Sequence, residues 1–273
     1  MSFDAYYDQI KQEAKFLYEN MAASVIFLFG FDTLADAKCA VYAVKEACDL
    51  PLCVLLDFKN DTRLADGFDI TAATITLQSL GISALGVMAG DCDVTLDILL
   101  NMKEFAAIPL FAFPEANSYI TPYEYAHYAQ NFINNKCVMF GTGKGTDNRF
   151  VAQIAKELWQ AEPFMPDFPM INAVCGKTNI CFFDFQDQMI GDCTSMIEID
   201  LKNVTSFKEI DVIIEKLIST GLPPVCFISS DIEMLGRAVK LYPGRVAVKS
   251  DEYGEIVAKE YGAQILTSEK GEN

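Results

Sequence analysis

The sequence has 273 residues, of which 51% are hydrophobic and 22% charged, so it has the composition of a folded globular protein and not of a disordered chain. Its 38 Asp and Glu outnumber its 21 Lys and Arg, and the resulting net charge of −17 repels nucleic-acid phosphates and anionic lipid surfaces. We therefore expect neither a nucleic acid nor a membrane as a partner.

The expected location follows from the N-terminal segment and the cysteines. The N-terminus carries acidic residues early and lacks the apolar core of a signal peptide, and the longest apolar stretch, residues 22–31, is too short to cross a bilayer. We predict a cytoplasmic protein, in which the nine cysteines are reduced thiols and mostly act as small buried side chains.

Along the first 160 residues, short apolar runs alternate with longer helical patterns, which is typical of βα units around a parallel sheet. The pattern predicts strands at residues 24–29, 52–57, 84–88, 109–113 and 137–140. It predicts helices at residues 34–47, 70–80, 94–102, 122–133 and 149–160. The helix at 122–133 is the best marked, because Thr121 is an N-cap, Pro122 fills the first helical position and Glu124 completes a capping box.

Residues 161–175 contain three prolines and no clear period, so they are predicted to be a linker. After the linker we predict strands at 180–185, 196–201, 224–229, 246–250 and 265–267, with helices at 209–219, 232–241 and 255–261. The units before and after the linker come close in number to a barrel of about eight βα units. We therefore predict an α/β fold of the (βα)8 TIM-barrel type, truncated or hybrid, in which residues 1–160 and 176–273 close one barrel. A doubly wound open sheet is the main alternative, and both architectures place functional residues where strands end.

Four segments of the first half carry a resemblance to a known family. They are FDTLADAKCAVYAV, PLCVLLDFKNDTRLADGFDITAATITLQSLGISALGV, PLFAFPEANSYITPYEYAHYAQNF and CVMFGTGKGTDN, in this order along the chain. Over about residues 15–160 the sequence resembles the homocysteine-binding barrel of the cobalamin-dependent methionine synthases, within the homocysteine S-methyltransferase family. Residues 175–270 are more weakly similar to the pterin-binding barrel of the same enzymes, chiefly through PPVCFISSDIEMLGRAVKLYPGRVAVKSD.

The resemblance implies a zinc ion, held by three cysteines, that stabilises the thiolate of homocysteine. It places those three cysteines at Ala89, Gly143 and Lys144, and none of these side chains can supply a thiolate. We therefore predict no metal site and no cofactor in this chain.

Other positions of the resemblance are altered as well. A substitute metal site would need Cys92 together with the carboxylates of Asp57 and Asp91. The pterin-contacting positions of the family fall on Ile228 and Lys249, and the Asp-x-His-x-x-Gly motif for cobalamin is absent. The single histidine, at position 127, is interpreted as a surface or packing residue of its helix.

The strongest local feature that remains is the loop Gly141-Thr142-Gly143-Lys144-Gly145-Thr146, which follows a predicted strand and precedes a helix. Backbone N–H groups in this context bind anions, although the spacing is not that of a Walker motif. The alternative is a tight turn that needs its glycines. A wider set of polar residues is expected at strand ends, where it could line a ligand pocket: Asp32, Asp57, Asp91, Glu115, Lys144, Glu198, Asp200 and Lys249.

Three functions are compatible with these observations. The first is a member of the homocysteine methyltransferase family without zinc-dependent methyl transfer, which binds a small molecule or a methionine-cycle or corrinoid protein. The second is an active homocysteine methyltransferase with a rearranged site. The third is a barrel enzyme that binds an anionic or phosphorylated metabolite at residues 141–146. Since a fold does not by itself grant a function, the sequence favours the first without deciding whether catalysis remains.

Overall fold

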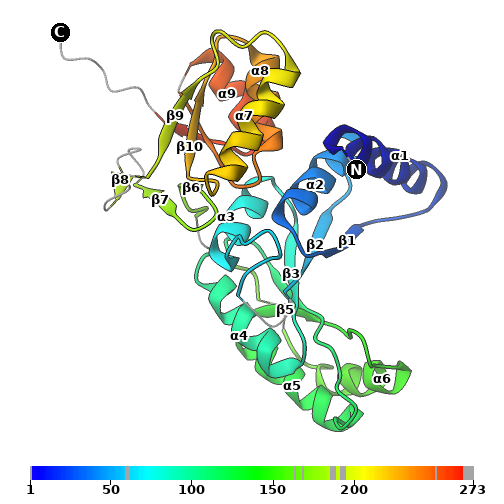
Figure 1. The fold of residues 1–273 in the computed structure, drawn as a ribbon. Helices are drawn as coiled ribbons and strands as arrows, with labels where there is room; N and C mark the ends of the chain where they lie inside the picture. The colour runs from blue at the N-terminus through cyan, green and yellow to red at the C-terminus, as the bar shows by residue number, and fades with distance from the viewer. Residues whose placement is uncertain are drawn as a thin grey trace.

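The computed structural model describes residues 2–58, 62–162, 164–167, 169–184, 189–190, 195–249 and 251–266. The chain folds into two α/β lobes, each built on a parallel sheet (Figure 1). The first lobe consists of α1 (Phe3–Asn20), β1 (Ile26–Phe31), α2 (Leu34–Ala47), β2 (Leu52–Asp57), α3 (Ile70–Ser79), β3 (Ala84–Met88), α4 (Cys92–Lys103), β4 (Leu110–Ala112), α5 (Pro122–Asn134), β5 (Cys137–Phe140) and α6 (Asn148–Glu157).

Side-chain caps explain where several helices of this lobe begin. The Asp69 carboxylate accepts the Ala72 N–H at 2.8 Å at the start of α3. At the start of α5, the Thr121 hydroxyl accepts the Glu124 N–H at 3.2 Å while the Glu124 carboxylate accepts the Thr121 N–H at 2.9 Å. The predicted capping box is therefore confirmed.

The five strands of the first lobe are parallel and lie in the order β1-β2-β3-β4-β5. Alternate residues of a strand point to opposite faces. Val54, Leu56 and Val87 point toward the helices and belong to the main core. Leu55 and Phe111 belong to a separate small cluster on the other face of the sheet. The helices therefore cover one face only.

The second lobe is also parallel, with the strand order β12-β11-β10-β9. It consists of β9 (Ile197–Asp200), α7 (Phe207–Ser219), β10 (Val225–Ile228), α8 (Ile232–Leu241), β11 (Ala247–Lys249), α9 (Glu252–Tyr261) and β12 (Gln264–Leu266). A small antiparallel sheet precedes it in the chain, with β6 (Ala173–Cys175), β7 (Ile180–Phe183) and β8 (Met189–Ile190).

Strands β6 and β7 cover the face of the second parallel sheet that its helices leave free. Side chains of the two sheets form one buried cluster: Val174, Cys181 and Phe183 from the antiparallel sheet, with Cys226, Ala247 and Leu266 from the parallel one. The second parallel sheet is thus packed on both faces.

A buried lysine joins the two lobes. Lys38 of α2 is 2% exposed, and its Nζ donates to the carbonyl oxygens of Val239 (2.9 Å), Tyr242 (2.7 Å) and Gly244 (2.9 Å) at the end of α8. Three carbonyl acceptors match the three donors of an ammonium group, and they lie at the negative end of a helix. Desolvation by burial lowers the pKa of Lys38 to about 7.

The α/β fold with parallel strands is confirmed, and the predicted strands of the first half overlap β1 to β5. Among the described residues, no strand of one parallel sheet pairs with a strand of the other, so a closed barrel is not detected. The pairing therefore gives no support to the prediction that both halves close a single barrel. The ends of three predicted strands, at residues 185, 250 and 267, lie outside the described residues.

Three elements were not predicted, namely α1, β6 and the two-residue strand β8. Helix α1 has an amphipathic pattern and a Ser2 N-cap, whose hydroxyl accepts the Ala5 N–H at 3.3 Å. Strand β6 lies inside the predicted linker, because its antiparallel pairing with β7 supplies the order that its own sequence lacks. In the described part of the chain, no helix combines the length and the apolar character that crossing a bilayer requires.

Candidate functional site

The structure brings together the loops that follow β3, β4 and β5. The Glu115 N–H donates to the Gly90 carbonyl at 2.7 Å, and the Gly143 N–H donates to the Pro114 carbonyl at 2.9 Å. The Tyr125 hydroxyl from α5 also donates to the Pro114 carbonyl, at 2.6 Å. Backbone hydrogen bonds therefore hold the three loops at the carboxyl edge of the sheet, where functional residues were expected.

The glycines of the loop 141–146 allow this close approach. A Cβ atom at Gly143 would lie 2.7 Å from the Pro114 carbonyl oxygen, and one at Gly145 would lie 2.1 Å from that of Ala116. Gly145 also has a φ of +84°, which a residue with a side chain rarely adopts. The Lys144 carbonyl accepts the Ala116 N–H at 2.8 Å in the same contact. The glycines thus have a packing role.

Several polar groups of the loop are already used within the protein. The Gly141 N–H donates to the Ala112 carbonyl at 2.9 Å, and the Thr146 hydroxyl donates to the Gly143 carbonyl at 2.7 Å. These groups hold the shape of the loop.

The helix that follows the loop has its N-terminus capped by a carboxylate. The Asp147 side chain accepts the Arg149 N–H at 2.9 Å and forms an ion pair with the Arg149 guanidinium at 2.7 Å. The Asp147 carboxylate therefore supplies the negative charge that the N-terminus of this helix favours. The Lys144 side chain is exposed. Anion binding at this loop stays a prediction.

The residues at the expected zinc position start at the end of β3. Ala89 is fully buried, and its carbonyl oxygen accepts the Thr95 hydroxyl at 2.9 Å. Cys92 is the buried first residue of α4, and desolvation, followed by the charges of Asp91 and Asp93, raises the pKa of its thiol to about 12. A thiol that stays protonated is a poor metal ligand, because the thiolate is the form that binds.

These residues do not fit a zinc ion. Ala89 has no donor atom, Gly143 has no space for a longer side chain, and Lys144 would bring a positive charge. Among the residues that the structure describes, no group of three or more His, Cys, Asp and Glu side chains is arranged to hold a metal ion.

The wider set of polar candidates is divided between the lobes. Asp32 follows β1 and Asp57 ends β2, so both lie on the first sheet. Lys249 of β11 instead forms an ion pair with Glu198 of β9 in the second lobe. Asp200 ends β9 and belongs to that lobe too. The structure therefore assembles the first-lobe candidates along one sheet edge and places the other three on a different sheet.

His127 lies on the surface of α5, with its side chain 76% exposed and its Nδ1 4.0 Å from a Glu157 carboxylate oxygen. This placement agrees with its interpretation as a surface residue.

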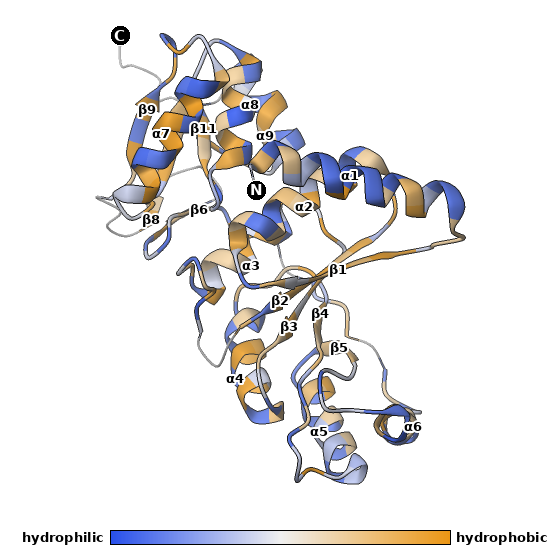
Figure 2. Ribbon diagram, turned by 45° about the vertical axis from the view of Figure 1, so that its right-hand side comes forward, coloured by the Kyte–Doolittle hydropathy of each residue, from blue (hydrophilic) through white to orange (hydrophobic). Residues whose placement is uncertain are grey.

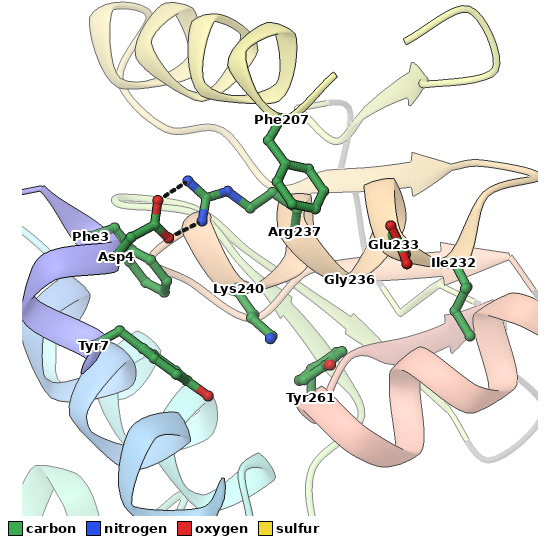
Figure 3. A pocket seen from close by; sticks show the side chains of 10 residues that line it. All are labelled: Phe3, Asp4, Tyr7, Phe207, Ile232, Glu233, Gly236, Arg237, Lys240 and Tyr261. Carbon is green, nitrogen blue, oxygen red and sulfur yellow. Dashed lines mark hydrogen bonds and ion pairs between the residues drawn. The ribbon is translucent and has the colours of Figure 1, made fainter. Parts of the chain in front are cut away.

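A cavity between the lobes was not found by sequence reasoning. It has a volume of about 260 Å³ and lies between α1, α8 and α9 (Figure 3). Lys240 lines it, with its Nζ 5.7 Å from the centre of the Tyr7 ring and 4.7 Å from that of Tyr261. The three residues come from three helices, so no local pattern could have grouped them.

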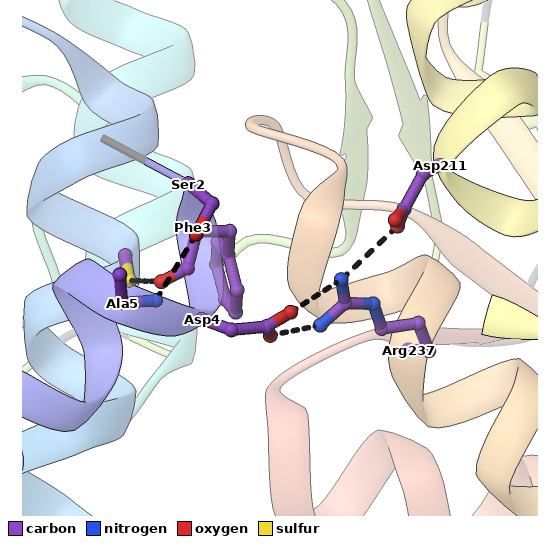
Figure 4. A network of polar contacts seen from close by, with 7 residues as sticks. Ser2, Phe3, Asp4, Ala5, Asp211 and Arg237 are labelled. Atoms are coloured by element: carbon purple, nitrogen blue, oxygen red, sulfur yellow. Dashed lines mark hydrogen bonds and ion pairs between the residues drawn. The ribbon is translucent and has the colours of Figure 1, made fainter. Parts of the chain in front are cut away.

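In the wall of this cavity, Arg237 of α8 connects α1 with α7 (Figure 4). Its guanidinium pairs with Asp4 through two nitrogen–oxygen contacts, one of them at 3.1 Å, and with Asp211 at 3.0 Å. It also lies 5.5 Å from the ring centres of Phe3 and Phe207. With both carboxylates satisfied by one arginine, this network has the character of a structural contact between lobes.

Comparisons with known proteins give one family model and solved structures of similar fold. The homocysteine S-methyltransferase family model matches residues 1–158. The homocysteine methyltransferase MmuM of Escherichia coli in its apo form superimposes with a TM-score of 0.51 and 13% identity, over 57% of this chain and 57% of that chain. Its metallated form gives a TM-score of 0.49 and 14% identity, over 57% and 52%. No match was found among curated proteins. The chain therefore spans a little over half the length of these structures, and the likeness at this identity concerns the fold alone.

Proposed function

We propose that this chain, which belongs to the homocysteine S-methyltransferase family through residues 1–158, does not carry out zinc-dependent methyl transfer. We propose instead a non-catalytic relative that binds a small molecule or a methionine-cycle or corrinoid protein at the carboxyl edge of its first sheet.

One observation carries the proposal. The three positions at which the family resemblance implies zinc thiolates hold Ala89, Gly143 and Lys144, and the neighbouring thiol of Cys92 is buried with its pKa raised to about 12. Methyl transfer to homocysteine needs a thiolate near neutral pH, which a metal ion would supply. Without such ligands, the chemistry has no means to lower the pKa of the substrate thiol.

The packing around Gly143 supports the same conclusion. Its missing Cβ would lie 2.7 and 2.8 Å from the carbonyl oxygens of Pro114 and Phe113, so a cysteine cannot be restored there without a backbone shift. The loop 141–146 therefore packs directly against the backbone of Phe113 and Pro114 at Gly143, the position where the resemblance places a zinc ligand.

Native mass spectrometry of the purified protein, with and without zinc and homocysteine, tests the proposal. We expect no stoichiometric zinc adduct and no methionine when a methyl donor and a corrinoid carrier are supplied. Zinc bound in a one-to-one ratio together with methionine formation would contradict the proposal and indicate a rearranged active site.

A Cys92→Ser variant is the matched control. If wild type binds zinc and the variant does not, Cys92 is a zinc ligand. This result would favour an active homocysteine methyltransferase with a rearranged site. Zinc retained by the variant would point to adventitious surface binding. Binding of inorganic phosphate that is lost in Lys144→Ala would favour the alternative of an anionic metabolite at residues 141–146.

A further inference from the structure

Strand β1 forms an edge of the five-stranded sheet and pairs with β2 alone in the described part of the chain. An edge strand presents backbone N–H and C=O groups to any chain that can align with it. The side chains of this edge are apolar and unusually open, since Phe29 is 73% exposed and Phe27 38% exposed. The edge therefore has the features that proteins normally conceal.

A groove runs between this edge and helix α1. Its volume is about 270 Å³, and its walls come from Tyr6 and Ile10 of α1 and from Leu28 and Phe29 of β1. Figure 2 shows β1 extending away from the body of the first lobe, with α1 on one side of it. We call this feature the edge groove. It offers a strand edge and an apolar wall at the same place.

Apolar exposure continues beyond the groove. Phe16 at the far end of α1 is 62% exposed, Met21 in the connection to β1 is 58% exposed, and Val25 just before β1 is 37% exposed. These three residues add to the exposed apolar side chains of β1, and exposed apolar patches mark interaction sites on proteins.

The charge at the groove indicates the kind of partner. Asp32 and Asp36 line it at the carboxyl end of β1, and the whole chain carries a net charge of −17. A second copy would bring the same carboxylates and the same net charge to the contact, which is unfavourable. A segment with basic residues would be attracted.

We propose that the edge groove binds an extended segment of another protein, which adds a strand beside β1. The partner segment has alternating apolar residues that contact Phe27 and Phe29, and a Lys or Arg near Asp32 and Asp36. Main-chain hydrogen bonds supply affinity in this mode of recognition, and side-chain pockets supply specificity. The regular part of β1 is short because its register with β2 shifts between Leu28 and Phe31, so the partner segment is short as well.

This inference goes beyond the proposed loss of methyl transfer, and it does not depend on it. The edge groove shares only Asp32 with the ligand-binding candidates of the sheet edge.

Binding of a labelled peptide tests the proposal. The probe is a short alternating Val-Thr peptide with a Lys at each end. The control is the same peptide with its central residue replaced by proline, which removes a main-chain donor. We expect saturable binding of the first peptide only, measured by fluorescence anisotropy, and slower hydrogen exchange of the β1 amides in the complex.

A pair of variants gives the specificity. Phe29→Lys should weaken binding by about tenfold or more, since it removes an apolar contact and adds a repelling charge. Tyr119→Lys is the matched control, because Tyr119 is a 91% exposed aromatic residue that does not line the groove, and it should leave binding unchanged. Equal binding of both peptides, or an equal effect of both variants, would overturn the proposal. So would a homodimer in sedimentation velocity that Phe29→Lys dissociates, since a second copy would then occupy the edge.

Discussion

The two parallel sheets of this protein differ in how the face opposite their helices is covered. In each, helices cover one face and leave the other without a helical partner. In the second lobe, strands β6 and β7 pack Val174, Cys181 and Phe183 over the free face. In the first lobe, the free face has only its own small cluster around Leu55 and Phe111, and Phe27 and Phe29 at the edge remain exposed.

The difference indicates which lobe covers its own sheet and which lobe leaves apolar surface exposed to another molecule. A sheet face covered by the chain itself contributes to folding stability, whereas an exposed apolar edge costs stability unless a partner covers it. The first lobe, which is the part that matches the family, is the open one. We therefore expect partner binding at the first lobe and a larger contribution to folding stability from the covered sheet of the second.

The largest expected effect tests this comparison directly. Phe183→Ala removes a ring that is 6% exposed from the cover of the second sheet, and we expect the free energy of unfolding to fall by about 3–5 kcal/mol. Phe29→Ala, at a residue 73% exposed, should change it by about 0.5 kcal/mol or less. Urea denaturation of both variants measures the difference. Similar losses would mean that the edge of the first sheet is as well packed as the covered face.

The second prediction concerns the contact between the lobes. Lys38→Met leaves three buried carbonyl oxygens without their donor, so we expect a loss of about 2–4 kcal/mol. Lys15→Met is the control, because the Lys15 side chain is 63% exposed. If the lobes form one cooperative unit, fluorescence and circular dichroism will give a single unfolding transition for wild type. Two transitions, with only the first shifted in the variant, would show that the lobes unfold separately.

The third prediction concerns the loop edge of the first sheet. Gly143→Cys should destabilise the protein by about 1–3 kcal/mol, because its Cβ would lie within 3 Å of two carbonyl oxygens. It should not create a zinc site. Thr142→Cys adds a thiol to the same loop and is the matched control. Thermal unfolding with and without zinc separates the loss of packing from any binding of zinc. A zinc-dependent rise in the melting temperature of Gly143→Cys would contradict the interpretation that the loop leaves no space for a zinc ligand at this position.

The fourth prediction is a pH dependence of the stability. Burial lowers the pKa of Lys38 to about 7, while a lysine in the unfolded chain titrates near 10.5. Between these values the unfolded state binds more protons than the folded state, so stability should rise with pH. The free energy of unfolding of wild type relative to Lys38→Met should therefore increase from pH 7 to pH 10. A constant difference would indicate that the three carbonyl acceptors keep the ammonium charged in the folded protein.

Much of the first lobe could be predicted from the sequence. Strand β2 and helix α2 have the predicted bounds, and the start of α5 is set by its capping box, because these elements depend on local periodicity and caps. Helix α1 could have been predicted from the spacing of Phe3, Tyr6, Tyr7 and Ile10 after Ser2. Strand β6 could not, since three residues among prolines form a strand only through their pairing with β7.

The candidate site shows the same limit. Spacing after strands correctly brings the loops that contain Gly90, Glu115 and Gly143 together, because carboxyl ends of parallel strands share one edge. Spacing could not show that Lys249 pairs with Glu198 on a different sheet. Nor could it show the cavity between α1, α8 and α9, because its α1 residues lie more than 200 positions along the chain from those of α8 and α9.

The sequence by itself determined the α/β class, the family resemblance and the absence of thiolates at Ala89, Gly143 and Lys144, because these follow from residue identities and short-range periodicity. Only the tertiary structure decided which sheet face is covered, that a buried Lys38 joins the lobes, and that the edge beside Phe29 is open. These properties depend on which distant segments pack together. Packing is decided by the shape and desolvation of whole surfaces, and no local pattern records it.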